Sequence, residues 1–439
     1  MTNKVRLGGY IDTRKGYAFK SGWYTDEGVP IVKVSDFTYD SVDASNLVCI
    51  SEEIASAYKK YELKTGDVVI QTVGSWPSNP QSVVGKVIKV PKEASRALLN
   101  QNAVKLIPNN YLHQSFLYYL LRNQDFKSHI IGCAQGAASQ ASITLDAIRE
   151  YKFLLPSIAS QEKISDILSA YDCLIENNTR RIKLLEEIAR SLYNEWFVKF
   201  RFSGHEQINT NSWQKVKLKD VCREITVGHV GSMANEYVEK GIPFLRSQNI
   251  LPFNLNLDSI KYITHEFHKK LKKSALSPGD VAVVRTGYPG TACVIPSTLP
   301  IANCADLVII RPSEKINAHY IAYIFNSIWG QKTVAGSLVG VAQQHFNVGA
   351  AKEMIINLPP DSIQQKFSNF ASTVFSEIET LQAKNQNLRK TRDLLLPKLI
   401  SGEIDMERWI AWERKGRSQV RNLKMSTPEI EEKNEIQTF

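Results

Sequence analysis

The sequence predicts an α+β protein made of two homologous, mixed α/β globular modules and two long helices that form an antiparallel coiled coil. Three observations lead to this prediction. Segments of the first half recur, in order, in the second half. Each half begins with short β-type runs separated by glycine, proline and asparagine. Each half then continues into a stretch whose apolar residues alternate at spacings of three and four. The whole chain is therefore expected to be a tandem repeat with pseudo-two-fold symmetry.

The repeat is visible as matched segments at a nearly constant offset. The segment Gly28–Lys33 recurs 213 residues later as Gly241–Arg246, with the same Gly-x-Pro opening. Further along, the offset falls to about 204, and Gly136–Gln140 corresponds to Gly340–Gln344. An ordered series of matches with one small deletion is not expected by chance, so it predicts a duplication of about 200 residues.

The two modules are expected at residues 1–155 and 201–357. Val68–Val73 in the first and Val281–Arg285 in the second are short β-type runs, as expected of strands. A helical segment lies among the strands of each module, at Tyr111–Arg122 and again at His319–Trp329. Strands mixed with a helix in this way predict an α/β module in each half.

The two long helices are expected at residues 156–200 and 358–401, and a charged tail follows at 402–439. Spacings of four and three are held for more than four heptads in both halves, which favours a paired coiled coil over two helices packed separately on their own modules. One asparagine interrupts each seam. The predicted seam residues are Ile164, Leu168, Ile175, Asn178, Ile182, Leu185 and Leu192 in the first helix, and Phe367, Val374, Leu381, Asn385 and Leu388 in the second.

The order of the segments predicts how the helices run. The first helix leads from the first module to the second, so a second helix related to it by a pseudo-two-fold must run back, antiparallel to the first. From Ile164 to Trp196 a helix is roughly 50 Å long at about 1.5 Å per residue, which exceeds one turn of B-DNA, about 34 Å. Pro397 cannot lie inside a regular helix and is expected to stop or kink the second helix near Leu396.

Composition narrows the class of protein. Lysine and arginine exceed aspartate and glutamate by ten in 439 residues, which favours a polyanionic partner. The six cysteines are scattered without C-x-x-C spacing, as expected of reduced thiols in a cytoplasmic protein. No apolar stretch approaches the roughly 18 residues that cross a bilayer, and no signal-peptide pattern opens the sequence. A membrane partner is therefore not expected.

Motifs that would indicate catalysis are missing from the sequence. It has no phosphate-binding G-x-x-x-x-G-K-[ST] loop and no G-x-G-x-x-G after a strand. Ser78–Gln81 lacks the second proline and the aromatic residue of an amino-methyltransferase motif. His265 and His268 fit a lysine-rich, solvated helix face better than a metal pair. We therefore expect no catalytic residue, no metal site and no cofactor in this chain.

Together these features resemble the specificity (S) subunits of Type I restriction–modification enzymes. The Gly-x-Pro openings, the Gly-Asp-Val segments at Gly66 and Gly279, and the closing Leu394–Ile404 are similar to that family's sequences. The resemblance covers roughly residues 4–405. Two features depart from it: Thr72–Gly74 of the first module stands where the second has Arg285–Gly287, and the charged tail extends past the usual ending.

The resemblance implies an architecture and a set of partners. It implies two target recognition domains that read a bipartite, asymmetric sequence in double-stranded DNA, joined by a coiled coil that sets the unread spacer. Two adenine methyltransferase (M) subunits would dock along the helices, and restriction (R) subunits would join them, in a defence against foreign DNA. S-adenosylmethionine, ATP and Mg²⁺ would belong to those partners.

DNA-contacting candidates follow from the loops of the modules, because arginine and lysine suit guanine edges and phosphates, and asparagine and glutamine suit adenine edges. Positions that are equivalent in the two halves suit contacts to the DNA backbone better than base reading. The alternative for each residue is an ordinary surface or turn side chain, and for the whole protein a coiled-coil scaffold whose modules bind protein or small molecules. The candidates are Lys33, Thr72, Ser75, Asn79, Gln140, Arg246, Gln248, Arg285, Tyr288, Gln343 and Gln344.

Overall fold

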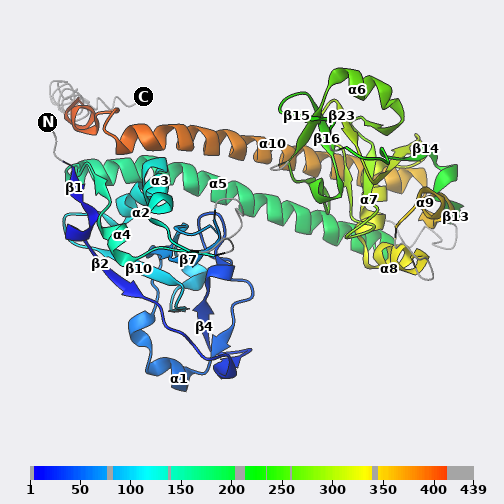
Figure 1. Cartoon of the computed structure of the whole chain (residues 1–439). Coiled ribbons are helices and arrows are strands. Elements are labelled where there is room, and N and C mark those ends of the chain that lie inside the picture. The colour runs from blue at the N-terminus through cyan, green and yellow to red at the C-terminus, as the bar shows by residue number, and fades with distance from the viewer. Residues whose placement is uncertain are drawn as a thin grey trace, which may run out of the picture. The chain divides into compact units, whose positions relative to one another are not determined.

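In the computed structural model, the chain forms two compact units. Unit 1 comprises residues 1–175 and 387–439, and unit 2 comprises residues 176–386. Each unit contains one α/β module and a part of both long helices (Figure 1). The described residues are 4–76, 83–136, 140–202, 213–233, 235–257, 260–338 and 345–412.

Module 1, the globular part of unit 1, is built on a four-stranded antiparallel sheet in the order β2-β10-β6-β8. All four residues of β6 are buried, because Val68 and Ile70 pack with helix α2 on one face of the sheet while Val69 belongs to a second core cluster. A strand covered on both faces needs a continuous apolar run, and this explains the sequence pattern there. These elements are β2 (Ile11–Lys15), β10 (Ala103–Pro108), β6 (Val68–Gln71), β8 (Val87–Lys89) and α2 (Gln114–Arg122).

A second sheet of module 1 has the order β3-β5-β4-β9, in which β4 and β9 are parallel. Gly28 precedes β4 with φ +130°, and a Cβ at this position would lie 2.2 Å from the carbonyl oxygen of Ile50. The glycine of the Gly-x-Pro opening is therefore required by the close approach of β5. The strands are β3 (Tyr24–Thr25), β5 (Cys49–Ile50), β4 (Val29–Val32) and β9 (Leu98–Leu99).

Module 2, the globular part of unit 2, repeats this arrangement. Its first sheet has the order β14-β24-β21-β22, and helix α7 packs on it as α2 does in module 1. Its second sheet has the order β15-β19-β16-β23-β20, with β16 and β23 parallel. The elements are β14 (Cys222–Val227), β24 (Leu307–Pro312), β21 (Val281–Val284), β22 (Ala292–Val294), β15 (Tyr237–Val238), β19 (Lys261–Ile263), β16 (Ile242–Leu245), β23 (Ala302–Cys304), β20 (Ala275–Leu276) and α7 (Ala318–Asn326).

Shorter elements complete the two modules. In module 1 they are β1 (Val5–Arg6), α1 (Glu52–Ser56), β7 (Val73–Gly74), α3 (Gln124–Cys133), β11 (Ala141–Ser142), α4 (Leu145–Arg149) and β12 (Lys152–Phe153). In module 2 they are β13 (Gln214–Lys217), β17 (Ile250–Leu251), β18 (Asn254–Leu255), α6 (His265–Lys270), α8 (Ile328–Ser337), α9 (Val348–Glu353) and β25 (Ile355–Leu358). The shared order of sheets and helices confirms the predicted duplication.

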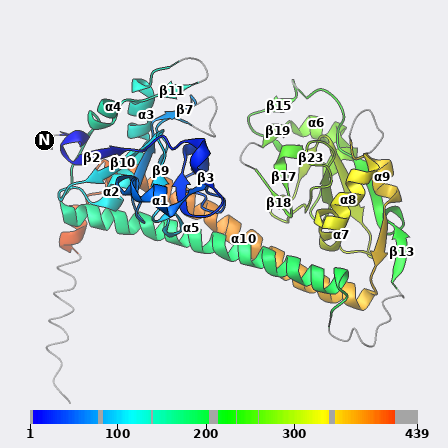
Figure 2. The same ribbon diagram turned by 90° about the horizontal axis from the view of Figure 1, so that it is seen from below.

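The two long helices are α5 (Ile158–Tyr193), which continues into a π-helical turn at Asn194–Val198, and α10 (Asp361–Ile400). They run side by side in both views (Figures 1 and 2). In unit 2, Asn178 of α5 donates a hydrogen bond to Asn385 of α10 at 2.9 Å, and Arg181 donates to Glu377 at 3.0 Å. Partner numbers fall along α10 as they rise along α5, so the helices are antiparallel, which confirms the predicted coiled coil.

Both helices begin in the same way. The side-chain amide of Gln161 donates a hydrogen bond to the carbonyl oxygen of Pro156 at 2.9 Å. That of Gln364 donates in the same way to Pro359, also at 2.9 Å. These two pairs lie 203 residues apart, so the repeat extends into the helices and defines which of their residues are equivalent.

Every predicted seam residue is buried or half-buried. Leu168 and Phe367 have no exposed surface, and Ile182 and Leu185 pack against the core cluster that contains Val374 and Ile378. The apolar periodicity therefore corresponds to the buried face of each helix.

The predicted effect of Pro397 was wrong by one turn. Helix α10 passes through Pro397 and ends at Ile400. A proline this close to the end removes a single hydrogen bond of the helix. Leu396 and Leu399, on either side of the proline, are buried in the core of unit 1 and hold this last turn in place.

The start of the charged tail packs on unit 1. Residues 406–412 are helical, and Met406 is buried in the core. The carboxylate of Glu407 accepts a hydrogen bond from the hydroxyl of Ser160 at 3.4 Å, and the ammonium of Lys163 lies 4.3 Å from the ring of Trp409. This segment therefore covers the beginning of α5, whereas residues 413–439 lie outside the described residues.

In the part of the chain that the structure describes, none of the helices combines the length and the apolar character that a membrane span requires.

Candidate nucleic-acid interface

Lys33 and Arg246 occupy the same local structure in the two modules. Lys33 follows β4 and Arg246 follows β16, the equivalent strands of the second sheets, and each residue precedes a short 3-10 turn. The backbone N–H of Lys33 donates to the carboxylate of Asp36 at 2.7 Å, and that of Arg246 donates to the amide oxygen of Asn249 at 3.0 Å. The capping residue three positions on thus fixes the backbone of both basic residues in the same way.

A tyrosine ring lies beside each of these cations. The ammonium of Lys33 is 5.1 Å from the ring of Tyr24, and the guanidinium of Arg246 is 5.9 Å from the ring of Tyr237. The two tyrosines are also 213 residues apart. A cation held over a ring face keeps its charge and loses part of its conformational freedom. The duplication has therefore placed the same oriented positive charge in both modules.

Arg285 and the Arg246 turn meet at Asp306 in module 2. The guanidinium of Arg285 donates to Oδ1 of Asp306 at 3.1 Å, and the hydroxyl of Thr286 donates to Oδ2 at 2.5 Å. The hydroxyl of Ser247, next to Arg246, donates to the backbone carbonyl of Asp306 at 3.4 Å. The Arg285 side chain is 16% exposed, so it is largely buried and reaches the surface only in part, with one edge held by a carboxylate.

Tyr288 is strongly exposed, with 85% of its surface free. It lies in the turn between β21 and β22, where Gly287 and Gly290 have φ of +86° and +87°. The N–H of Gly290 donates to the carbonyl of Val284 at 3.0 Å and closes the turn. A ring presented in this way can contact a ligand with its full face.

Thr72, the counterpart of Arg285 in module 1, is buried with 6% exposure. Its N–H and its hydroxyl both donate to the carbonyl of Asn102, at 2.9 and 3.1 Å, and its own carbonyl accepts from Ile143 at 2.9 Å. The hydroxyl of Thr72 is therefore bonded inside the module, and a contact of Thr72 with DNA stays a prediction.

Ser75 and Gln140 are brought together by the short pairing of β7 with β11, in which Gly74 lies opposite Ala141. Gln140 is exposed and Ser75 is half-buried. Gly136 opens the Gln140 loop with φ +147°, and a Cβ there would lie 2.1 Å from the carbonyl of Gln140.

Module 2 ties the corresponding loops through one backbone bond, from the N–H of Phe346 to the carbonyl of Arg285 at 3.1 Å. In module 1 the loop after β6 therefore lies beside the loop that precedes α4. In module 2 the loop after β21 lies in the same way beside the loop that precedes α9. Gln248 is exposed on the turn that follows Arg246. Asn79, Gln343 and Gln344 lie outside the described residues.

Sequence reasoning missed Asp306, which organises the module 2 site. Asp306 could have been found from the offset of 204 in this part of the repeat, which aligns it with Asn102, the residue that Thr72 contacts.

The lysine-rich α6 raised the question of a metal pair, but the Nδ1 atom of His268 lies 3.2 Å from the side-chain amide of Asn303, inside the module. Among the described residues, no group of three potential metal ligands is assembled.

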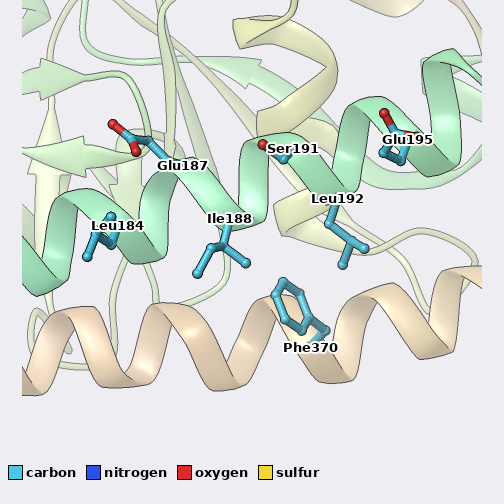
Figure 3. A pocket seen from close by; sticks show the side chains of 7 residues that line it. All are labelled: Leu184, Glu187, Ile188, Ser191, Leu192, Glu195 and Phe370. Carbon is cyan, nitrogen blue, oxygen red and sulfur yellow. The ribbon is translucent and has the colours of Figure 1, made fainter.

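A second surface lies on the helices of unit 2, where an open groove of about 510 Å³ is lined mainly by α5. Leu184 and Ile188 are 53% and 52% exposed. Figure 3 shows Ile188 and Leu192 of α5 pointing towards Phe370 of α10, with Glu187 pointing away from it. Exposed apolar side chains in such a row, with an acidic rim, are typical of a protein contact surface.

A family model and individual relatives of this chain point to the same kind of protein. The family model described as "Type I restriction modification DNA specificity domain" matches residues 2–187 and 210–390. The chain is 25% identical over 321 residues to the Type I restriction enzyme MjaIX specificity subunit of Methanocaldococcus jannaschii, a match that covers 70% of this chain and 73% of that protein. It is 18% identical over 438 residues to the EcoBI specificity subunit of Escherichia coli, covering 91% and 86%.

Among solved structures, the fold is similar to that of the S subunit of a Type I restriction–modification system from M. genitalium. The TM-score is 0.57 at 15% identity, and the match covers 90% of this chain and 95% of that one. At this identity the likeness concerns the fold alone.

Proposed function

The chain belongs to the Type I restriction modification DNA specificity family, and on this premise we propose that it is the DNA sequence-recognition subunit of a Type I restriction–modification complex. The observation that carries the proposal is the repeated basic site. Both matched segments contain a cation on a capped turn beside a tyrosine, at Lys33 and again at Arg246.

Each module would bind one part of a bipartite, asymmetric sequence in double-stranded DNA. Lys33 and Arg246 are equivalent, so they suit contacts to phosphates, which set the register of a protein on DNA without reading its sequence. Arg285 and Tyr288 in module 2 stand where module 1 has Thr72 and Ser75, so Arg285 and Tyr288 suit base reading. Gln140 corresponds to Gln344 in the repeat, so it suits a contact to the DNA backbone. An arginine oriented by a carboxylate, as Arg285 is by Asp306, is well placed to bond a guanine edge.

The helix pair would set the unread spacer between the two half-sites. The 36 residues of α5 give about 54 Å of helix at 1.5 Å per residue. Removing one heptad from each helix would shorten the pair by roughly 10 Å, and the recognised spacer would shrink by about one to three base pairs.

Catalysis would come from other subunits of the complex. Two M subunits would dock along the helix pair, and the apolar, acid-rimmed groove at Ile188 and Phe370 supports such a contact in unit 2. R subunits would join them. S-adenosylmethionine, ATP and Mg²⁺ would be held by these partners, while this chain supplies the sequence recognition.

A map of N6-methyladenine in the genome of the host tests the proposal, with the gene intact, deleted, and replaced by the Arg285→Ala variant. We expect deletion to remove methylation of one bipartite motif, modified once on each strand. The Arg285→Ala variant is expected to broaden one half of that motif only. An unchanged map, in cells where the M subunit is expressed and copurifies with this chain, would contradict the proposal. Purified protein without salt-sensitive affinity for duplex DNA would instead favour a scaffold that binds proteins or small molecules.

A further inference from the structure

In unit 1 a single carboxylate joins the module to both long helices. Asp172 lies on α5, and its Oδ2 accepts a hydrogen bond from the hydroxyl of Tyr119 on α2 at 2.7 Å. Its Oδ1 accepts from the guanidinium of Arg392 on α10 at 2.5 Å. Three segments that are far apart in the sequence thus meet at one side chain, which we call the Asp172 junction, formed by Tyr119, Asp172 and Arg392.

The junction is buried and charged. The side chain of Arg392 is 3% exposed and that of Asp172 is 19% exposed. Burial alone would lower the pKa of Arg392, but its bonds to Asp172 and Asp393 outweigh burial and raise the pKa. Burial, together with the charge of Asp172, also raises the pKa of Tyr119, so the phenol keeps its proton and remains a donor.

A buried ion pair contributes little net stability compared with a well-packed apolar pair. A buried ion pair does fix the relative orientation of its two side chains, because a charge-assisted hydrogen bond weakens steeply when the donor moves out of line with the acceptor. A rotation of α2 over the helix pair would break the Tyr119 bond, and a shift of α10 along α5 would break the Arg392 bond.

Helix α2 is tied to its own module as well. Arg122, one turn after Tyr118, donates to the hydroxyl of Tyr118 at 2.6 Å and lies 3.7 Å from the carboxylate of Asp40. The hydroxyl of Tyr118 donates to the backbone carbonyl of Asp40 at 3.3 Å. Because α2 is fixed to the module by these bonds, the orientation of α2 at the junction is the orientation of module 1.

The equivalent place in unit 2 is apolar. With the offsets of the repeat, Asp172 corresponds to Phe375, Arg392 to Ala189 and Tyr119 to Tyr323. The ring of Tyr323 lies 6.2 Å from that of Phe375. Aromatic packing of this kind tolerates small rotations that a hydrogen bond to a carboxylate does not.

We infer that Tyr119, Asp172 and Arg392 are positioning residues that fix module 1 on the helix pair, and that they make recognition strict for one spacer length. The inference rests on the proposed function. On B-DNA, one added base pair moves a half-site by about 3.4 Å and rotates it by about 35°. A module held by directional bonds cannot follow such a rotation without breaking them, whereas a loosened module can.

The test uses the full chain with its methyltransferase partner and the motif found by methylation mapping. Affinity is measured for duplexes that carry both half-sites with the native spacer and with spacers one base pair shorter or longer. Tyr119→Phe removes one hydroxyl and keeps the ring. We expect it to reduce the preference for the native spacer by about 10- to 100-fold, the worth of one hydrogen bond to a charged group, with little change in affinity for the native site.

Two further variants make the result specific. Tyr323→Phe makes the same change at the equivalent position of α7, and we expect it to leave the spacer preference unchanged. The double variant Asp172→Asn with Arg392→Leu removes both charges together, so no buried charge is left unpaired, and it should relax the spacer preference at least as far as Tyr119→Phe.

The outcomes separate the two proposals. A wild-type complex that binds no bipartite duplex would refute the proposed function and this inference with it. Binding of the native site, together with an unchanged spacer preference in Tyr119→Phe and in the double variant, would overturn the inference alone. A lower melting temperature without a change in spacer preference would assign these residues a purely structural role.

Discussion

Modules 1 and 2 share their strand order and the oriented cation, but they differ after the central strand of the first sheet. Module 1 has Thr72, whose hydroxyl bonds the carbonyl of Asn102 inside the fold. Module 2 has Arg285, whose guanidinium is held at the surface by Asp306. The same backbone therefore supports a neutral, buried contact in one half and an oriented surface charge in the other. We conclude that the duplication kept the framework and the shared positive charge, while the residues suited to base reading diverged.

The units differ in a second way, in how each module is attached to the helix pair. At the position where unit 1 has the Asp172 junction, unit 2 has packed aromatic rings. Among these, His319 stacks on Phe375 with ring centroids 4.4 Å apart and planes 3° apart. By the repeat, Phe375 stands where unit 1 has Asp172. An aromatic junction that contains a histidine should respond to acid, because burial penalises the charged form of the ring.

The largest effect is therefore expected on lowering the pH. Burial lowers the pKa of His319 to about 4 from 6.5, and its Nδ1 is enclosed without a hydrogen-bond partner among the described residues. Between these two values the unfolded chain binds a proton that the native state does not bind. The free energy of unfolding should therefore fall as the pH drops from 6.5 to 4, by about 3 kcal/mol.

Urea denaturation of the wild type and of His319→Phe at several pH values measures this effect. The phenylalanine keeps the stacked ring and removes the proton, so the difference in stability between the two proteins should grow as the pH falls. A difference that is constant from pH 7 to pH 4 would show that His319 is not titrating in this range. Tyr323→Phe, in the same cluster, is the control and should follow the wild type.

The second largest effect is expected at the position where the two modules differ, which is Thr72 in module 1 and Arg285 in module 2. Arg285→Ala should weaken binding of the native duplex by about 10- to 100-fold and relax the sequence requirement of one half-site, because a lost arginine–guanine contact is worth about 1–3 kcal/mol. Thr72→Val, the matched change in module 1, removes only the internal hydroxyl. It should cost about 1 kcal/mol of stability and leave both half-sites as strict as before.

Competition binding with duplexes substituted at each position of the motif distinguishes these outcomes. If Arg285→Ala weakened binding equally for every sequence, Arg285 would be a phosphate contact, and the two modules would not differ in the way proposed. If Thr72→Val altered the sequence requirement, the placement of Thr72 in the core would be irrelevant to its role.

Much of the fold could be predicted from the sequence because its signals are periodic or repeated. The seam of α5 and α10 follows from apolar spacing, and buried β6 follows from the run Val68–Gln71. The Asp172 junction could not be predicted, because Tyr119, Asp172 and Arg392 are distant in sequence and each is ordinary in its own segment. Asp306 escaped for the same reason, since its role depends on Arg285 being folded next to it.

The smallest effect tests what the modules share. Lys33→Ala and Arg246→Ala should each weaken binding by about 1 kcal/mol and lower the slope of log affinity against log salt by about one, without changing the preferred sequence. The two effects should be similar, because both cations sit on the same capped turn beside a tyrosine. Salt titrations of both variants against native and scrambled duplexes measure this. A loss confined to the native duplex would make that residue a base reader. A loss in one variant alone would end the equivalence of the two modules at this shared cation.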